Sequence, residues 1–168
     1  MEANLNMNIA GSGKIPSGEY NKVSVSGSGS LYGKVKCFSF SGAGSVKGES
    51  IECYDTFKAS GSVSFKEEVK AKNVSIAGSF ACGGMLTVEE KCSCAGSVKC
   101  KKSVKCDQLS VAGTLNVEGD IEAETVKVDG VVNCSGLLNA ENIEIKIEKG
   151  MDIGSIGGSK IVVLEKTK

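Results

Sequence analysis

The sequence predicts an all-β, single-domain parallel β-helix with three sides and about seven coils of 17–18 residues. Two observations carry this prediction: glycines recur at nearly constant spacing, and three pairs of apolar residues lie between consecutive glycines. No apolar pattern of helical period competes, and proline occurs only at Pro16. The glycines of the series are Gly27, Gly44, Gly61, Gly78, Gly96, Gly113 and Gly130.

The spacing of these glycines defines the repeating unit. All intervals between neighbours in the series are equal except the one from Gly78 to Gly96, which is longer by a single residue. A short, constant period is typical of an architecture in which each unit is one coil of chain stacked on the previous one. Glycine adopts positive φ at the lowest cost, so each member of the series is expected at a corner. A stack of similar layers favours a surface or an assembly over a single catalytic cleft.

The apolar residues within each unit predict three short strands. Counted from the glycine, apolar or small residues recur at positions 2, 4, 8, 10, 13 and 15. Residues two apart lie on the same face of a strand, so each pair marks a strand with one side turned inward. In the unit after Gly113 the six are Leu115, Val117, Ile121, Ala123, Val126 and Val128.

Two irregularities are expected inside the stack. One extra residue lies near Glu89–Lys91, and the coil after Gly44 is slipped by one residue on its second side, where it uses Ile51 and Cys53. The chain is divided into an N-terminal tail with a first partial coil (1–22), the β-helix core (23–147) and a C-terminal strand or cap (148–168). The apolar run Ile161–Leu164 is the candidate for that last strand.

Composition restricts the function. Twenty lysines balance twenty acidic residues, and the chain has no Arg, His or Trp. Zero net charge provides no field to attract nucleic acid, and the missing residue types remove bidentate phosphate recognition, histidine bases and histidine metal ligands. We therefore expect no catalytic residues, no cofactor, no metal and no nucleic-acid partner. No long apolar run and no signal peptide is evident, so a cytoplasmic location is expected.

The eight cysteines all fall on inward positions or their slipped equivalents. Free cysteine behaves as a small hydrophobic residue and is among the most buried types, so core filling is the main interpretation. Cys82 and Cys100 are expected to stack one above the other, which leaves a disulfide as an alternative. A metal role for the Cys92–Cys94 pair lacks further ligands. The set is Cys37, Cys53, Cys82, Cys92, Cys94, Cys100, Cys106 and Cys134.

Two surface features admit a second interpretation. A row of hydroxyl side chains follows the corner glycines and is expected to face outward; it is either a by-product of tight corners or a face for a glycan or ice. At the N-terminus, Leu5, Met7 and Ile9 alternate, which indicates a strand or short tail, with weak contact to a membrane surface as the alternative. The row comprises Ser28, Ser45, Ser62, Ser79, Ser97 and Thr114.

The repeat texture resembles that of bactofilins, the polymer-forming cytoskeletal proteins of bacteria. The resemblance rests on segments such as Ile9–Gly13, Val23–Gly27, Leu109–Leu115 and Ile156–Val163, and covers nearly the whole chain. It implies a right-handed parallel β-helix that polymerises end to end, without nucleotide, into non-polar filaments. It also implies a scaffold for cell-shape or envelope-synthesis proteins, often beside the membrane. The chain departs from many members in its many cysteines and its lack of long flanking tails.

Elementary physics supports assembly through the ends of the stack, because the first and last coils expose unpaired backbone groups and apolar surface. The alternative is a β-helix that does not polymerise and presents a flat face to a protein or a glycan. An enzyme is disfavoured because the corners are too short to build a cleft. The expected self-assembly residues are Val23, Val25, Leu31 and Phe40 at one end and Leu138, Ile143, Ile145 and Ile147 at the other.

Overall fold

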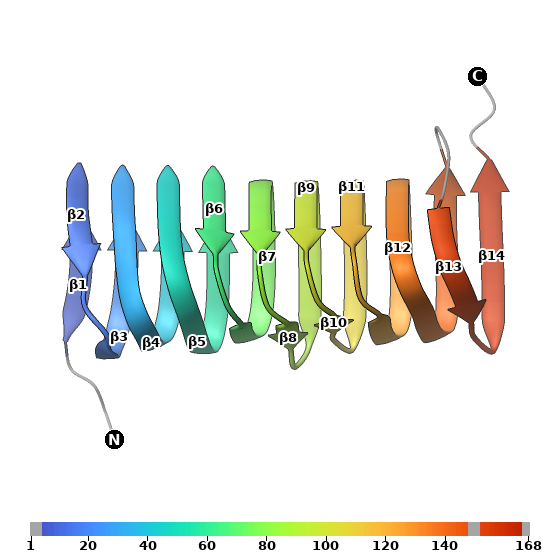
Figure 1. Cartoon of the computed structure of the whole chain (residues 1–168), viewed down its shortest axis with the longest axis horizontal. Coiled ribbons are helices and arrows are strands. Elements are labelled where there is room, and N and C mark those ends of the chain that lie inside the picture. Colours follow the sequence, from blue (N-terminus) through green and yellow to red (C-terminus); the bar gives the residue numbers. More distant parts are fainter. Residues whose placement is uncertain (1–4, 148–151, 166–168) are drawn as a thin grey trace.

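The fold is a stack of coils in a parallel β-solenoid, and the computed structural model describes residues 5–147 and 152–165. Every strand pairing within these residues is parallel, and the coils follow one another in sequence order along the long axis (Figure 1). The strands are β1 (Asn6–Ile9), β2 (Ser12–Ile15), β3 (Gly18–Val25), β4 (Ser28–Gly42), β5 (Ser45–Ala59), β6 (Ser62–Phe65), β7 (Val69–Cys82), β8 (Leu86–Val88), β9 (Lys91–Cys100), β10 (Val104–Lys105), β11 (Gln108–Val117), β12 (Ile121–Ile147), β13 (Asp152–Gly157) and β14 (Lys160–Glu165).

The predicted fold class is confirmed, whereas the number of coils is about nine rather than about seven. The first additional coil was expected only as a partial coil within residues 1–22, because β2 pairs with β4 at an interval shorter than the glycine period by one, as in Ser12↔Ser28, and because Gly13 occupies an inward position. The last one is built by β13 and β14, which both pair with β12. The expected last strand at Ile161–Leu164 therefore exists as β14, while residues 148–151 and 166–168 of the expected cap lie outside the described residues.

Both predicted irregularities are confirmed by the register. Between β4 and β5 the interval equals the glycine period at Leu31↔Gly48, is shorter by one at Cys37↔Cys53, and returns to the period at Phe40↔Phe57. From β7 to β8 the interval equals the glycine period at Ala71↔Val88, and from β7 to β9 it is longer by one residue at Val74↔Cys92. The chain absorbs each change at a corner, so the inward positions stay in line.

The corner glycines are required by contact between coils as well as by turn geometry. Gly44, Gly78, Gly96, Gly113 and Gly130 have φ between 142° and 150°, which disfavours other residues. A Cβ at any of these positions, or at Gly27 and Gly61, would also collide with the carbonyl oxygen of the glycine one coil earlier. The corner therefore brings two backbones closer than any side chain permits.

The core is a narrow column of inward side chains in which large rings stack on one another or lie over a small residue. Phe40 and Phe57 stack with ring centroids 4.8 Å apart, and Phe65 and Phe80 meet Phe57 edge to face at 5.9 Å. The inward position of Gly48 makes room for the Phe65 ring, because a Cβ there would overlap it. Interiors pack at crystal-like density, so each large ring needs such a partner.

We predict that Gly96→Ala destabilises the solenoid more than Gly18→Ala does. At Gly96 the added Cβ meets backbone at a φ of +146°, whereas at Gly18 its nearest neighbour is the Tyr20 hydroxyl at an ordinary 3.5 Å. Backbone strain alone costs about 1–3 kcal/mol at Gly96. Urea unfolding monitored by circular dichroism measures both losses; equal losses would contradict the contact assigned to the corner.

Candidate functional site

The N-terminal residues expected to form an assembly surface are buried. Val23, Val25, Leu31 and Phe40 are each at most 2% exposed. β1 covers the first two through Met7↔Val23 and Ile9↔Val25, β2 covers Leu31, and β3 covers Phe40. These four side chains belong to the core because β1, β2 and β3 lie over them.

Three of the four C-terminal residues expected to form an assembly surface are also buried. Leu138, Ile143 and Ile145 are at most 2% exposed and pair with residues of β13 and β14. The backbone of Ile147 pairs with Glu165, but its side chain lies outside what the structure describes. The surface at this end is therefore one coil further out than expected.

That outer C-terminal layer presents three isoleucine and valine side chains to solvent. Ile156, Ile161 and Val163 are 39%, 42% and 44% exposed, although each is in register with a buried residue of β12. They occupy inward positions, so their exposure reflects the missing neighbour above them. Among the described residues, no strand pairs with the outer edge of β14. Sequence reasoning identified the apolar run that forms β14 but not its place as the outer layer.

The N-terminal layer differs because its own side chains close it. Ile9, Ile15 and Tyr20 are 9%, 0% and 5% exposed. The Tyr20 hydroxyl donates a hydrogen bond to the Pro16 carbonyl oxygen at 2.9 Å, and the Ile9 side chain lies across Gly13. Of the three alternating N-terminal residues, Ile9 is buried, Met7 is half-buried and only Leu5 is largely exposed.

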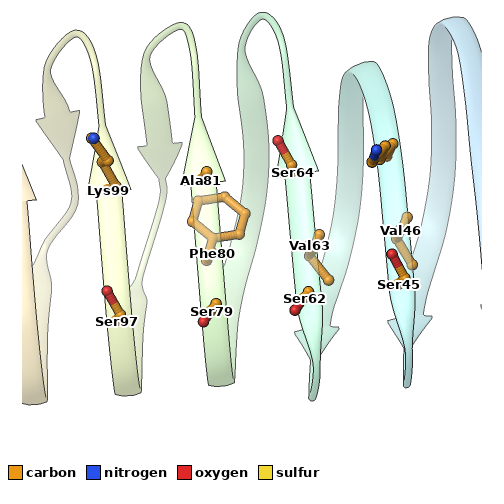
Figure 2. Close-up of a pocket in the computed structure, with 11 residues that line it drawn as sticks. Ser45, Val46, Ser62, Val63, Ser64, Ser79, Phe80, Ala81, Ser97 and Lys99 are labelled. Carbon is orange, nitrogen blue, oxygen red and sulfur yellow. The ribbon is translucent and has the colours of Figure 1, made fainter.

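The first side of the solenoid carries the predicted hydroxyl row. Successive register pairs from Ser28 to Thr114 place one hydroxyl per coil, and Ser12 extends the row by one coil. Four of these serines line a shallow hollow of about 290 Å³ together with Lys47 and Lys99. Figure 2 labels the four serines and Lys99. The hydroxyls are evenly spaced along the rod and point away from the core.

The second side carries charges of alternating sign. In the first four coils the outward residues in register are Glu19, Lys36, Glu52 and Lys70. Lys36 lies 3.7 Å from Glu19, and Lys34 lies 3.0 Å from Glu52. The hydrogen bond from Lys34 lowers the pKa of the Glu52 carboxyl and raises that of the Lys34 ammonium. The row continues with Thr87, Lys105 and Glu122.

The eight thiols are all free and buried, as expected for core filling. Cys82 and Cys100 are in register as predicted, and Cys37 lies over Cys53 with 3.2 Å between the sulfur atoms. That second stack was missed, although the slip on the second side of the Gly44 coil already implied it. A hydrogen bond with Cys37 and burial both raise the pKa of Cys53. Burial raises the pKa of Cys106 to about 12.

No group of three or more cysteine or acidic side chains within residues 5–147 and 152–165 is arranged to hold a metal ion. The same residues include no helix that is long and apolar enough to cross a membrane. What the described surface offers is one exposed apolar end layer and flat sides lined by regular rows.

Comparison with known proteins adds no relative. No protein-family model, no curated protein and no solved structure matches the chain significantly.

We predict that the buried Cys106 thiol makes the protein sensitive to alkaline pH. The folded pKa of Cys106 lies above that of an unfolded thiol, about 8.5, so above that pH the unfolded state releases a proton that the folded state keeps. Stability is therefore complete below about pH 8.5 and falls by about 1.4 kcal/mol per pH unit for this thiol up to its folded pKa.

Urea unfolding of the wild type and Cys106→Ala between neutral and alkaline pH measures this slope. The variant should lose stability less steeply with pH, whereas Val104→Ala, a nearby core substitution that removes no titrating group, should keep the wild-type slope. Identical slopes in all three proteins would contradict the assignment.

Proposed function

We propose that this chain is a structural subunit that self-assembles through the ends of its solenoid into filaments, without nucleotide. The observation that carries the proposal is the exposed layer formed by Ile156, Ile161 and Val163. The bactofilin-like repeat texture of the sequence supports it independently. On this proposal the filament is cytoplasmic and scaffolds cell-shape or envelope-synthesis proteins, and no catalytic activity or cofactor is assigned.

The end layer combines two forms of unsatisfied surface. The outer edge of β14 has backbone N–H and C=O groups that no described strand pairs, and its inward side chains lack the coil that buries their counterparts in β12. An edge of this kind is a template for another chain. Burying the rest of each side chain contributes on the order of 1 kcal/mol, and the strand pairing fixes the register.

The two ends are not equivalent, and this shapes the assembly. Ile9, Ile15 and Tyr20 close the N-terminal layer, whereas the C-terminal layer is open. The contact that buries most apolar surface therefore joins two C-terminal layers. Growth beyond that pair uses the outer backbone edge of β1 with the exposed Leu5 beside it. A contact between C-terminal layers that alternates with a contact between N-terminal edges gives a filament without polarity.

A binding module that does not polymerise is the second candidate. The hydroxyl row and its shallow hollow favour it, because evenly spaced hydroxyls on a flat face suit a repetitive ligand such as a glycan (Figure 2). This candidate requires that the protein stay monomeric at high concentration. Contact with a membrane surface through the N-terminal residues would involve mainly Leu5, since Ile9 is buried.

We predict that Ile161→Lys and Val163→Lys each abolish the contact between C-terminal layers, and with it filament growth, without unfolding the protein. Both side chains are already more than 40% exposed, so a lysine disturbs the contact and not the core. Leu164→Lys is the matched control, because Leu164 is 47% exposed but is in register with the outward Lys146. Negative-stain electron microscopy and light scattering without nucleotide measure the outcome.

Filaments or large particles are expected for the wild type and for Leu164→Lys, and their loss for the two other variants. A wild type that remains monomeric at high concentration would refute the proposed function. Unchanged assembly of Ile161→Lys and Val163→Lys would refute the end layer as its basis.

A further inference from the structure

The second side of the solenoid has a surface feature that end-to-end assembly does not use. Its first four coils carry outward residues of strictly alternating charge, Glu19, Lys36, Glu52 and Lys70. They belong to β3, β4, β5 and β7, which follow one another along the rod in Figure 1. Neighbouring parallel strands lie about 4.8 Å apart, so the four charges form a straight row at that spacing. We refer to this row as the charge row.

A pair of exposed aromatic residues lies beside the charge row at one corner. Phe38 follows Cys37 and Tyr54 follows Cys53, and these cysteines are register partners, so the two rings occupy the same corner of adjacent coils. Each ring is 54% exposed. Exposed aromatic pairs next to charged residues are characteristic of protein interfaces.

The aromatic pair is unusual within this chain. Of its five phenylalanines and three tyrosines, five are buried, and Tyr32 has Lys14 over its ring at 5.6 Å. Phe38 and Tyr54 are neither part of the described core nor covered by a lysine in this way. The buried aromatic residues are Tyr20, Phe40, Phe57, Phe65 and Phe80.

We propose that this side binds a second copy of the chain in antiparallel orientation, with the two-fold axis between the coils of Lys36 and Glu52. In this arrangement Lys36 lies opposite the partner's Glu52 and Glu19 lies opposite the partner's Lys70. The axis runs along the strand direction, so each corner meets the same corner of the partner. Phe38 therefore packs on the partner's Tyr54, and the reverse contact forms by symmetry.

Alternation of charge selects this orientation. If the two rods were parallel and in line, each residue would face its own copy, and every contact in the charge row would join like charges. In an antiparallel pair whose two-fold axis passes through a coil, like charges also face each other, because residues two coils apart have the same sign. Only an axis between coils brings opposite charges together along the whole row.

The aromatic residues select the position of the axis. Moved toward the C-terminus by one coil, the axis would keep opposite charges at Glu52 and Lys70 but would place Phe38 against the partner's Glu89, because Glu89 occupies the equivalent corner after Val88. The charges therefore set direction and register, and the rings contribute most of the affinity. Exposed ion pairs alone stabilise little, so this division is the expected one.

The lateral pair does not depend on the proposed end-to-end assembly, since it uses a side of the rod and not its ends. It is tested with the full chain carrying Ile161→Lys, which excludes the end layer. On this background we compare the parent, Lys36→Glu, Glu52→Lys and an equimolar mixture of the two variants. Sedimentation equilibrium and light scattering measure the mass of each sample.

The parent is expected to dimerise. Each single variant places like charges opposite each other twice in its own dimer, so the dissociation constant should rise about tenfold or more. The mixture should recover the dimer, because the glutamate introduced at position 36 of one variant then faces the lysine introduced at position 52 of the other, and every remaining contact is unchanged. Such recovery requires that positions 36 and 52 face each other across the interface.

Lys105 and Glu122 provide the matched control. They form the same kind of register pair on the same side, with an ion pair at 3.5 Å, but lie beyond the overlap of the two copies. Lys105→Glu and Glu122→Lys should leave dimerisation unchanged. A monomeric parent, a mixture that stays monomeric, or an equal loss in these controls would overturn the proposal.

Circular dichroism verifies the fold of each variant. If Lys36→Glu or Glu52→Lys fails to fold, Phe38→Ser and Tyr54→Ser take their place, because both rings are more exposed than buried. Each should weaken the dimer about tenfold or more while the spectrum stays that of the parent. Dimerisation unaffected by both substitutions would also overturn the proposal.

Discussion

The close contact between successive corner glycines is the constraint on which the structure depends. At each corner a Cβ would collide with the carbonyl oxygen of the glycine one coil earlier, so only glycine permits the coils to approach to strand-pairing distance. Because the glycine corners are stacked, each coil returns there to alignment with the previous coil. The one-residue slip between β4 and β5 and the extra residue before β9 are absorbed at the other corners of the coil and leave the glycine series aligned.

A fixed register explains both the interior and the surface rows. Inward positions recur one above another, so the Phe40 and Phe57 rings stack, Gly48 makes room for Phe65, and Cys37 meets Cys53. Burial in this column raises the pKa of thiols such as Cys53 and Cys106, because a charged sulfur is poorly solvated there. Outward positions recur in the same way, which turns single serines into a hydroxyl row and single Lys and Glu residues into a row of alternating charge.

Much of this could be predicted from the sequence, since a repeat places residues by their position within the period. The glycine spacing and the apolar pairs predicted the fold class, the burial of every cysteine and both register shifts. The first coil was expected only in part, because Gly13 fills an inward position and the interval to the next coil is shorter than the period. The end surfaces could not be predicted for a different reason. Ile145 and Val163 occupy the same position within the repeat, but Ile145 is covered by a further coil and Val163 is not, so the repeat alone does not show which of them is exposed. The lateral feature at Phe38 and Tyr54 depended on the slipped corner, which aligns two residues that the ideal count would separate.

The central functional claim is that another copy of the chain covers the outermost C-terminal layer. Hydrogen–deuterium exchange of β14 (Lys160–Glu165) measured as a function of protein concentration tests it most directly, because the amides on its outer edge gain hydrogen bonds only when a further strand pairs with them. The account predicts that exchange in β14 slows as concentration rises, while exchange in the central strands β9 and β11 stays slow and constant. Exchange in β14 that is fast and independent of concentration would contradict it.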